Sequence, residues 1–293
     1  GANDSNLWST LVPGNGTETS LDYGRSIAVH ELSDGTQTTV LLAIGAPGAN
    51  FPEWPVGGGR VYLYRLANGI WHETQVITPS ISSADSSQFG CAVDFGGSWL
   101  AIGHEERAVD SGLSNGGVEC HRWNGGVMEF QQQLLVPDPA STGLRFGAAV
   151  AMLPNWLVIG SPGNEEQGLD AGAAYLYEVD DLGQWQLHRK VKAFIGTPDE
   201  EFGACMELVG GRLVIGTNAR SEPDVAGSVW LYDYSDGSWQ EDVPLVPVQI
   251  QTPASYAYPH DLQRPGGYFG WGVAADGVWA VAASPLEQSP SVP

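Results

Sequence analysis

Short runs of apolar residues, about four to eight residues long and bounded by Gly, Pro, Asn or Asp, recur along the whole chain. They are rich in Val, Ile, Tyr and Trp, a composition typical of β-strands. No segment of useful length has the 3.6-residue period of an amphipathic helix. The hydrophobic pattern therefore predicts an all-β protein built from many short strands.

The predicted strands recur in a fixed order, so the chain contains internal repeats. Each copy opens with an aromatic residue, a glycine and a small apolar run, and a second run follows it. The opening elements are YGRSIAV at 23–29, FGCAVDF at 89–95, FGAAVAM at 146–152, FGACMEL at 202–208 and FGWGVAA at 269–275. The second elements are LAIGAP at 42–47, LAIGHE at 100–105, LVIGSP at 157–162, LVIGTN at 213–218 and the degenerate AVAASP at 280–285.

Two further elements complete each copy: a third strand such as GRVYLY at 59–64 or GAAYLY at 172–177, and a fourth that carries Trp71 or Trp185. Short turns between the first two elements predict a hairpin. Four antiparallel strands that recur every 56 to 67 residues describe the blades of a β-propeller. We expect the opening glycine to let the first strand enter the crowded centre, and the aromatic residue to wedge between adjacent blades.

These motifs resemble the FG-GAP repeat of the integrin alpha-chain propeller and its microbial relatives, over roughly residues 7–285. The resemblance implies a propeller that is usually extracellular, binds a protein or a glycan, and is not itself catalytic. Many members of the family carry a DxDxDG calcium loop between the first two strands. The nearest sequence here, SDGTQ at 33–37, offers one carboxylate where calcium needs several oxygen ligands. We therefore expect no family-type calcium site, no other metal site and no cofactor.

We interpret residues 1–293 as a single β-propeller domain with about five repeats, starting near 23, 89, 146, 202 and 269. The segment LWSTLVP at 7–13 matches the fourth element and is expected to form an outer closing strand beside the fifth repeat. No third element follows 280–285. The pattern thus predicts either an incompletely closed ring or a portion of a larger one.

The charge balance excludes one class of partner. Acidic residues outnumber Lys and Arg by 34 to 12, giving a formal net charge of −22, whereas nucleic-acid binding needs a basic surface. No apolar run approaches the roughly 18 residues of a membrane span. The opening GANDSNLW is too polar for a signal peptide, so any secretion signal has been removed or lies outside this sequence. We expect an extracellular or cell-surface protein without membrane insertion.

Catalytic motifs are missing: there is no P-loop, HExxH or CxxC sequence, and no strand–turn–helix context for a GxSxG nucleophile elbow. We expect His121 to be a packing residue in a strand, and His104, beside two glutamates, to lie at a solvated loop edge. The adjacent acids at 105–106, 165–166 and 200–201 are expected to point in different directions, unlike a glycosidase pair. The three cysteines, Cys91, Cys120 and Cys205, are interpreted as unpaired buried residues. The chain is therefore not expected to be an enzyme.

The connections between repeats and those between the second and third strands should emerge on one face. These loops hold 17 of the 34 acidic residues. They are either ordinary solvated loops or an acidic surface for a basic partner or for cations. Proline-stiffened aromatic residues stand in the two longest loops, where they either contact a ligand or cover the blade top. The candidate ligand-binding residues are Phe51, Trp54, Tyr256, Tyr258 and His260, and the candidate glycosylation sites are Asn3 and Asn15.

Two functions remain open at this point. The first is a non-catalytic extracellular recognition or adhesion module that binds a protein or glycan ligand through loops on one propeller face. The alternative is a structural subunit of an extracellular or cell-surface assembly, in which propeller faces and edges pack against neighbours by self-assembly.

Overall fold

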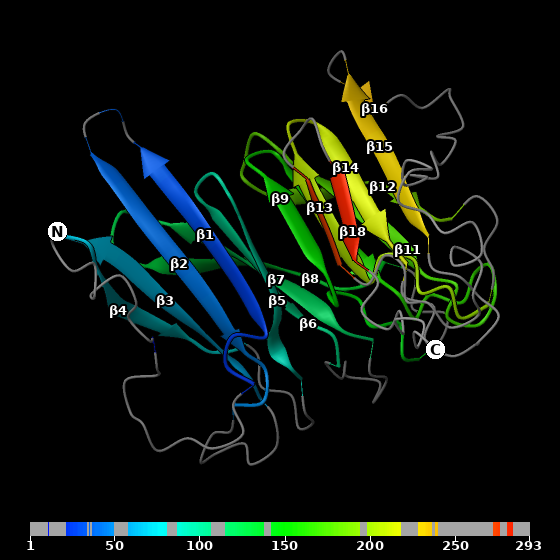
Figure 1. Cartoon of the computed structure of the whole chain (residues 1–293), viewed down its shortest axis with the longest axis horizontal. Helices are drawn as coiled ribbons and strands as arrows, with labels where there is room; N and C mark the ends of the chain where they lie inside the picture. The colour runs from blue at the N-terminus through cyan, green and yellow to red at the C-terminus, as the bar shows by residue number, and fades with distance from the viewer. Residues whose placement is uncertain are drawn as a thin grey trace, which may run out of the picture.

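The structure is a computed structural model, and it describes residues 11, 22–33, 35, 37–49, 58–80, 87–106, 115–137, 142–193, 198–217, 228–235, 238–239, 272–275 and 280–283. Every regular element in this part of the chain is a β-strand, as predicted. The strands form four sheets of four antiparallel strands, followed by a sheet of two (Figure 1). Within each sheet the strands lie side by side in chain order.

The first sheet consists of β1 (Ser26–Ser33), β2 (Thr38–Ala46), β3 (Arg60–Ala67) and β4 (Ile70–Ile77). The second consists of β5 (Phe89–Gly96), β6 (Trp99–His104), β7 (Gly117–Trp123) and β8 (Met128–Leu134). The third consists of β9 (Val150–Leu153), β10 (Trp156–Ser161), β11 (Ala173–Val179) and β12 (Trp185–Val191). The fourth consists of β13 (Cys205–Val209), β14 (Arg212–Gly216), β15 (Val229–Ser235) and β16 (Ser238–Trp239), and the fifth of β17 (Gly272–Ala275) and β18 (Ala280–Ala283).

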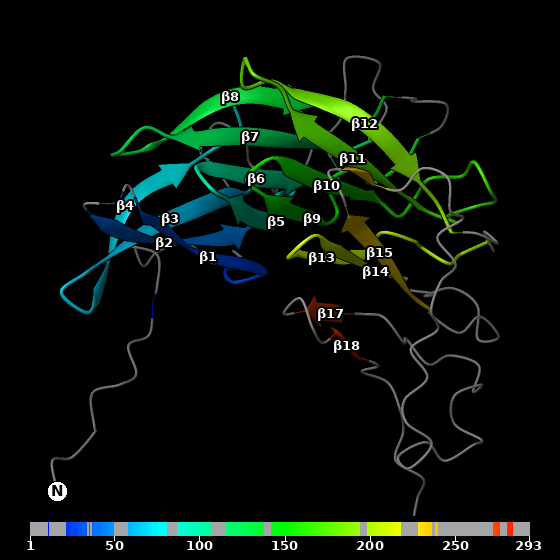
Figure 2. The same cartoon turned by 90° about the horizontal axis from the view of Figure 1, so that it is seen from above.

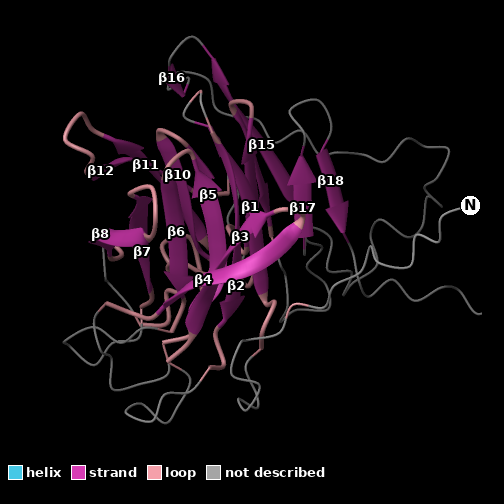
Figure 3. Cartoon of the chain, turned by 90° about the vertical axis from the view of Figure 1, so that its left-hand side faces the viewer, coloured by secondary structure: helices cyan, strands magenta, loops and turns pink. Residues whose placement is uncertain are grey.

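The sheets follow one another around a common centre, as the view from above shows (Figure 2). The first strands β1, β5, β9, β13 and β17 lie on the inner side, and each of the first four packs against the first strand of the next sheet. The inner strands lie roughly along one common axis with neighbours antiparallel, so their connections gather at the two ends of the sheets (Figure 3). Four-stranded antiparallel blades in this arrangement confirm the predicted propeller fold class.

Burial along the strands explains why the sequence pattern differs between them. Strands β6 and β10 are buried at every position, because a sheet covers each of their faces. The outer strands β8 and β12 bury only their first and last residues and leave polar residues exposed between them. Continuous apolar runs therefore mark the second strand of a sheet, and polar runs mark its outer edge.

The aromatic-Gly motif forms the same β-turn in the first four repeats. The residue before the aromatic has φ between 47° and 53°, and the glycine has φ between 88° and 94°. The backbone N–H after the glycine then donates to the carbonyl three residues earlier, as from Cys91 to Gln88 at 3.0 Å. A positive φ at the third position of such a turn is the reason for glycine there. The four turns span residues 22–25, 88–91, 145–148 and 201–204.

In the second, third and fourth repeats the aromatic residue of the motif wedges between two sheets, as predicted. Phe89 is fully buried among side chains of the first sheet, such as Leu63, and of the second, such as Leu100. Phe146 and Phe202 fill the same place between the second and third and between the third and fourth sheets. The glycine of the motif is crowded, as predicted. For example, a Cβ atom on Gly147 would overlap the carbonyl oxygen of Gly117 in the preceding repeat.

Glutamines hold the outer strands of neighbouring sheets together. The Gln75 side chain donates to the Met128 carbonyl at 2.9 Å and accepts from the Met128 N–H at 2.8 Å. Gln132 makes the same pair of bonds to Trp185, at 3.1 and 2.7 Å. The seams are therefore fixed at the outer edge by hydrogen bonds and further in by aromatic packing.

Two sequence-based expectations need correction or restriction. His104 does not lie at a solvated loop edge: it ends β6, is 1% exposed, and stacks edge-on against Phe89. Of the predicted closing strand at 7–13, only Leu11 is described; it lies outside any strand and packs against the apolar cluster of the first sheet. The other residues of that segment lie outside the described part of the chain.

Candidate binding face

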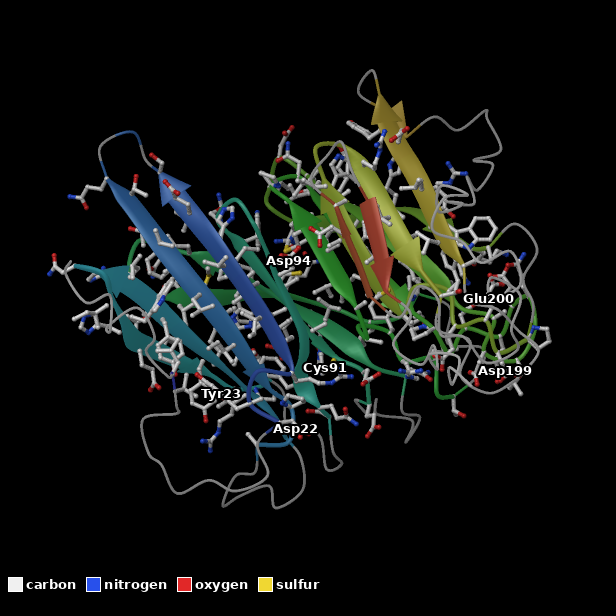
Figure 4. All side chains as sticks on the ribbon, in the orientation of Figure 1. Asp22, Tyr23, Cys91, Asp94, Asp199 and Glu200 are labelled. Carbon is white, nitrogen blue, oxygen red and sulfur yellow. The ribbon has the colours of Figure 1, made fainter. Side chains whose placement is uncertain are left out.

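The connections between repeats and those that precede each third strand meet at one end of the sheets, which we call the loop face. Single parallel bridges join Gly59 to Phe89, Gly116 to Phe146 and Gly172 to Phe202 across neighbouring sheets. Each bridge brings the start of a third strand beside the start of the next repeat. Figure 4 shows Asp22, Tyr23, Asp199 and Glu200 at this end, whereas Asp94 lies nearer the middle of the sheets.

The aromatic candidates taken from the sequence, Phe51, Trp54, Tyr256, Tyr258 and His260, lie outside the described residues, as do Asn3 and Asn15. The structure defines only the base of the loop that contains Phe51 and Trp54. There the Gly59 N–H donates to the Ala49 carbonyl at 3.0 Å and joins the two ends of the loop. The role assigned to these aromatic residues stays a prediction.

Arg145 links three successive repeats on the loop face. Its Nε donates to Oε2 of Glu105 at 3.1 Å, and one terminal nitrogen donates to Oε1 of Glu201 at 3.0 Å. The second terminal nitrogen lies 3.1 Å from the same Glu105 oxygen. Glu105 follows the second strand of the second sheet, while Arg145 and Glu201 precede the aromatic-Gly turns of the next two repeats. One guanidinium thus connects the second, third and fourth repeats.

The Arg145 ion pairs are largely shielded from water. The Arg145, Glu105 and Glu201 side chains are 29%, 11% and 10% exposed. Burial alone would lower the pKa of Arg145, but the charges and hydrogen bonds of the two glutamates raise it. The group therefore stays charged and compensates two buried acids. The sequence carried a signal for this network, a charged residue directly before the aromatic-Gly motif, but nothing in it paired Arg145 with particular glutamates.

Other acidic side chains on this face accept hydrogen bonds from neighbouring side chains of the protein. Glu200 is buried and accepts a hydrogen bond from the Ser228 hydroxyl at 3.0 Å. Glu166 accepts from Lys190 and Lys192, at 2.6 Å each, and these hydrogen bonds lower the pKa of Glu166 to about 2. The adjacent acids Glu200 and Glu201 therefore contact different partners, as the sequence analysis expected.

A further group of acids gives the face its negative charge; we call Glu165, Asp170 and Asp199 the acidic rim. Glu165 is exposed, and Asp170 and Asp199 are half-buried. Burial, together with the charges of Asp199 and Glu165, raises the pKa of Asp170, although Arg145 partly opposes this. Burial is the largest cause of the rise, and the charges of Asp199 and Glu165 add to it. The rim is a site where a cation would relieve repulsion.

Glu119 is a buried carboxylate that the sequence analysis missed. It lies in β7, is completely buried, and accepts hydrogen bonds from the Ser80 N–H and hydroxyl at 2.9 and 2.8 Å. His121 lies 3.1 Å from it, so His121 is a buried packing histidine, as predicted. Burial raises the pKa of Glu119, but the hydrogen bonds and the charge of His104 outweigh this and lower it. Glu119 thus fixes the connection that leaves the first sheet.

The described residues carry no sign of a metal or redox centre. Among them, no three His, Cys, Asp or Glu side chains are close enough to hold a metal ion. Cys91, Cys120 and Cys205 form no disulfide within the described residues; the first two are buried, and Cys205 is half-buried. No helix long and apolar enough to cross a membrane occurs in this part of the chain.

A groove of about 340 Å³ lies at the opposite end of the sheets, between the second and third sheets. Trp99, Arg122 and Asp181 are among the residues that line it. The Arg122 guanidinium stands 5.3 Å from the centroid of the Trp99 ring, a cation–π contact. The groove thus places Arg122 and Asp181 together, whereas the acidic rim gathers three acids, only partly offset by Arg145.

Comparison with known families identifies the repeat directly. Residues 130–177 match the family model described as the FG-GAP repeat. They are an FG-GAP repeat. This FG-GAP segment runs from β8 through β11 and includes Phe146, Gly147 and the Arg145 link. No curated protein sequence matches the chain.

Proposed function

We propose that this chain is a non-catalytic extracellular recognition module whose loop face binds a protein or glycan partner. The observation that carries the proposal is the acidic rim of Glu165, Asp170 and Asp199, in which burial and then the charges of Asp199 and Glu165 raise the pKa of Asp170. A partner that presents Lys or Arg side chains would relieve this repulsion and form charge-assisted hydrogen bonds. The favoured partner is therefore a cationic protein segment.

The scaffold beneath the rim supports a binding role. Arg145 fixes the relative positions of two aromatic-Gly turns and the end of β6 through Glu105 and Glu201, so the face is preorganised before a partner arrives. The buried carboxylates Glu105, Glu200 and Glu201 are each occupied by protein donors. Because these carboxylates are already paired with protein donors, they stabilise the surface and are not available to react with a substrate. This supports a non-catalytic role.

A binding experiment with a matched control tests the proposal. The probe is a fluorescent lysine- and arginine-rich peptide, measured by anisotropy at 50 mM and 300 mM salt. The double variant Glu165→Lys, Asp170→Lys should bind it at least tenfold more weakly than the native chain, because two attractive charges become repulsive. Asp181→Lys, on the groove at the opposite end, reverses one charge where the rim variant reverses two, and should leave the affinity within twofold.

The outcomes separate the candidate partners. Equal loss in the rim variant and in Asp181→Lys would mean that the peptide responds only to net charge, and the loop-face proposal would be wrong. If the peptide does not bind but a neutral glycan on an array does, and the rim variant abolishes that signal, the glycan form of the proposal holds. No binding in either format would favour the structural-subunit alternative.

A further inference from the structure

The first sheet has an apolar face that no part of the described chain covers. Ile27 and Val29 of β1 are 61% and 63% exposed. They are two residues apart, so their side chains lie on the same face of the strand. In the register of the sheet they lie opposite Ile44 and Leu42 of β2. Two large apolar side chains next to each other on a strand face mark a packing surface.

The same positions are buried in the next three repeats. They are identified by register, as the fourth and sixth residues after the aromatic of each turn, opposite the same pair of positions in the second strand. The equivalents of Ile27 are Val93, Val150 and Met206, and those of Val29 are Phe95, Met152 and Leu208. All six are between 3% and 9% exposed. Burial of this face is therefore the rule, and the first sheet is the exception.

The cover at each of these seams is the first strand of the preceding repeat. Its contacting residues are short, and they stand three and five positions after the aromatic. Ala92 shares an apolar cluster with Met152, and Asp94 accepts a hydrogen bond from the Met152 N–H at 2.7 Å. At the next seam Ala149 and Ala151 share a cluster with Met206 and Leu208. The face thus accepts a strand with small side chains at two alternate positions.

Strand β17 has the side chains that this face accepts. The third and fifth residues after Phe269 are Gly272 and Ala274. On its other side β17 already packs against β13, where the Cys205 thiol contacts the Val273 backbone. Ala274 is exposed. The last described sheet therefore presents the small-residue side of a seam, and the first sheet presents the large-residue side.

We propose that the β17–β18 sheet docks on the Ile27–Val29 face and closes the ring between the fifth and first repeats. The occupant is a segment of the same chain, so its effective concentration favours closure over binding of a second copy. By analogy with the Asp94–Met152 contact, Ala274 comes beside Val29. This surface is separate from the acidic rim, so the closure and the proposed function can fail independently.

Disulfide trapping tests the closure. In the double variant Val29→Cys, Ala274→Cys, mild oxidation should produce an intramolecular cross-link, seen as a peptide of residues around 29 joined to residues around 274 after proteolysis. The matched control Val76→Cys, Ala274→Cys places a cysteine on the exposed outer strand β4 and should give no such cross-link. A covalent dimer linked through 29 and 274 would show that the face binds a second copy and would overturn the proposal.

The melting temperature provides a second test of the closure that does not depend on disulfide formation. Closure buries Val29, so Val29→Asp should lower the melting temperature by about 5 °C or more. Val76→Asp introduces the same charge at a residue that is 40% exposed, and should change the melting temperature by less than about 2 °C. If Val29→Asp has no more effect than Val76→Asp and the cross-link is absent, the ring does not close here and the inference is wrong.

Discussion

Gly103 of one repeat and Gly147 of the next are packed backbone to backbone, so closely that a Cβ atom on Gly103 would overlap the Gly147 carbonyl oxygen. The same relationship joins Gly45 to Gly90 and Gly160 to Gly203. The Ile-Gly and aromatic-Gly motifs, which lie far apart in the sequence, are therefore two halves of one contact. Each repeat supplies one half to the repeat on either side.

This contact predicts a large effect of a small substitution. Gly103→Ala should destabilise the protein by about 3 kcal/mol, because the overlapping atom belongs to backbone and cannot rotate away. Urea unfolding measures the effect. Gly126→Ala is the control, since its Cβ would meet nothing nearer than the Asn124 Oδ1 at 3.7 Å. Equal stability of the two variants would contradict the proposed tightness of the seam.

Arg145 is expected to contribute more stability than an ordinary surface ion pair. Arg145→Met leaves Glu105 and Glu201 largely buried without their partner and should cost about 2 kcal/mol. Arg212→Met removes a more exposed pair with Asp233 and should cost less than about 1 kcal/mol. Thermal unfolding of both variants in one buffer gives the comparison. A larger loss for Arg212→Met would mean that the link between repeats has little energetic role.

Glu119 should make the protein sensitive to acid. Its pKa is lowered in the folded state, so its contribution is present above the unfolded value of 4.5 and is lost as the pH falls through the folded pKa. Glu119→Gln keeps the shape but weakens the hydrogen bonds from Ser80 and should cost about 2 kcal/mol at pH 7. The difference in the free energy of unfolding between Glu119→Gln and the native chain should be smaller at pH 3 than at pH 7. A gap that does not change with pH would show that the charge of Glu119 is unimportant.

Asp94 should have the opposite pH dependence. Burial raises its pKa to about 7, although it accepts hydrogen bonds from the Met152 and Phe95 N–H groups. A raised pKa means that its contribution is full below the unfolded value of 3.8 and is lost as the pH rises through about 7. Relative to Asp94→Asn, the free energy of unfolding of the native chain should therefore fall by roughly 2 kcal/mol between pH 5 and pH 8. Parallel stability curves for the two proteins would contradict this.

Removal of divalent cations should leave the fold intact. The hairpins between first and second strands lack the carboxylate series that a calcium loop requires. Addition of EDTA should therefore change the melting temperature by less than about 2 °C. A larger fall, reversed by calcium but not by magnesium, would show that loop carboxylates form a calcium site.

Much of the scaffold was predictable because its determinants are local. The period of the aromatic-Gly motif gave the repeats, and continuous apolar runs such as 157–160 marked strands covered on both faces. The wedge role of Phe89 and Phe146 followed from the same pattern. These features depend on residue size and on alternation along the chain, which can be read without knowing what lies across a seam.

The pairings across the seams were not predictable in this way. Arg145 reaches glutamates 40 and 56 residues away, and Glu119 is held by Ser80 from the preceding repeat. His104 was misjudged because its two acidic neighbours suggested solvent, whereas strand register places it against Phe89. A charged residue in a strand signals that a partner exists, but only the three-dimensional arrangement of sheets identifies that partner.

The wedge residues also bear on how the chain emerges during synthesis. The core of the first sheet includes Phe89, Leu100 and Ile102, which belong to the next repeat. The first sheet cannot complete its core until Ile102 has left the ribosome, and each later sheet must wait for its successor in the same way. Folding that proceeds from the N-terminus would therefore always leave one unfinished seam at the growing end, which moves forward by one repeat at a time.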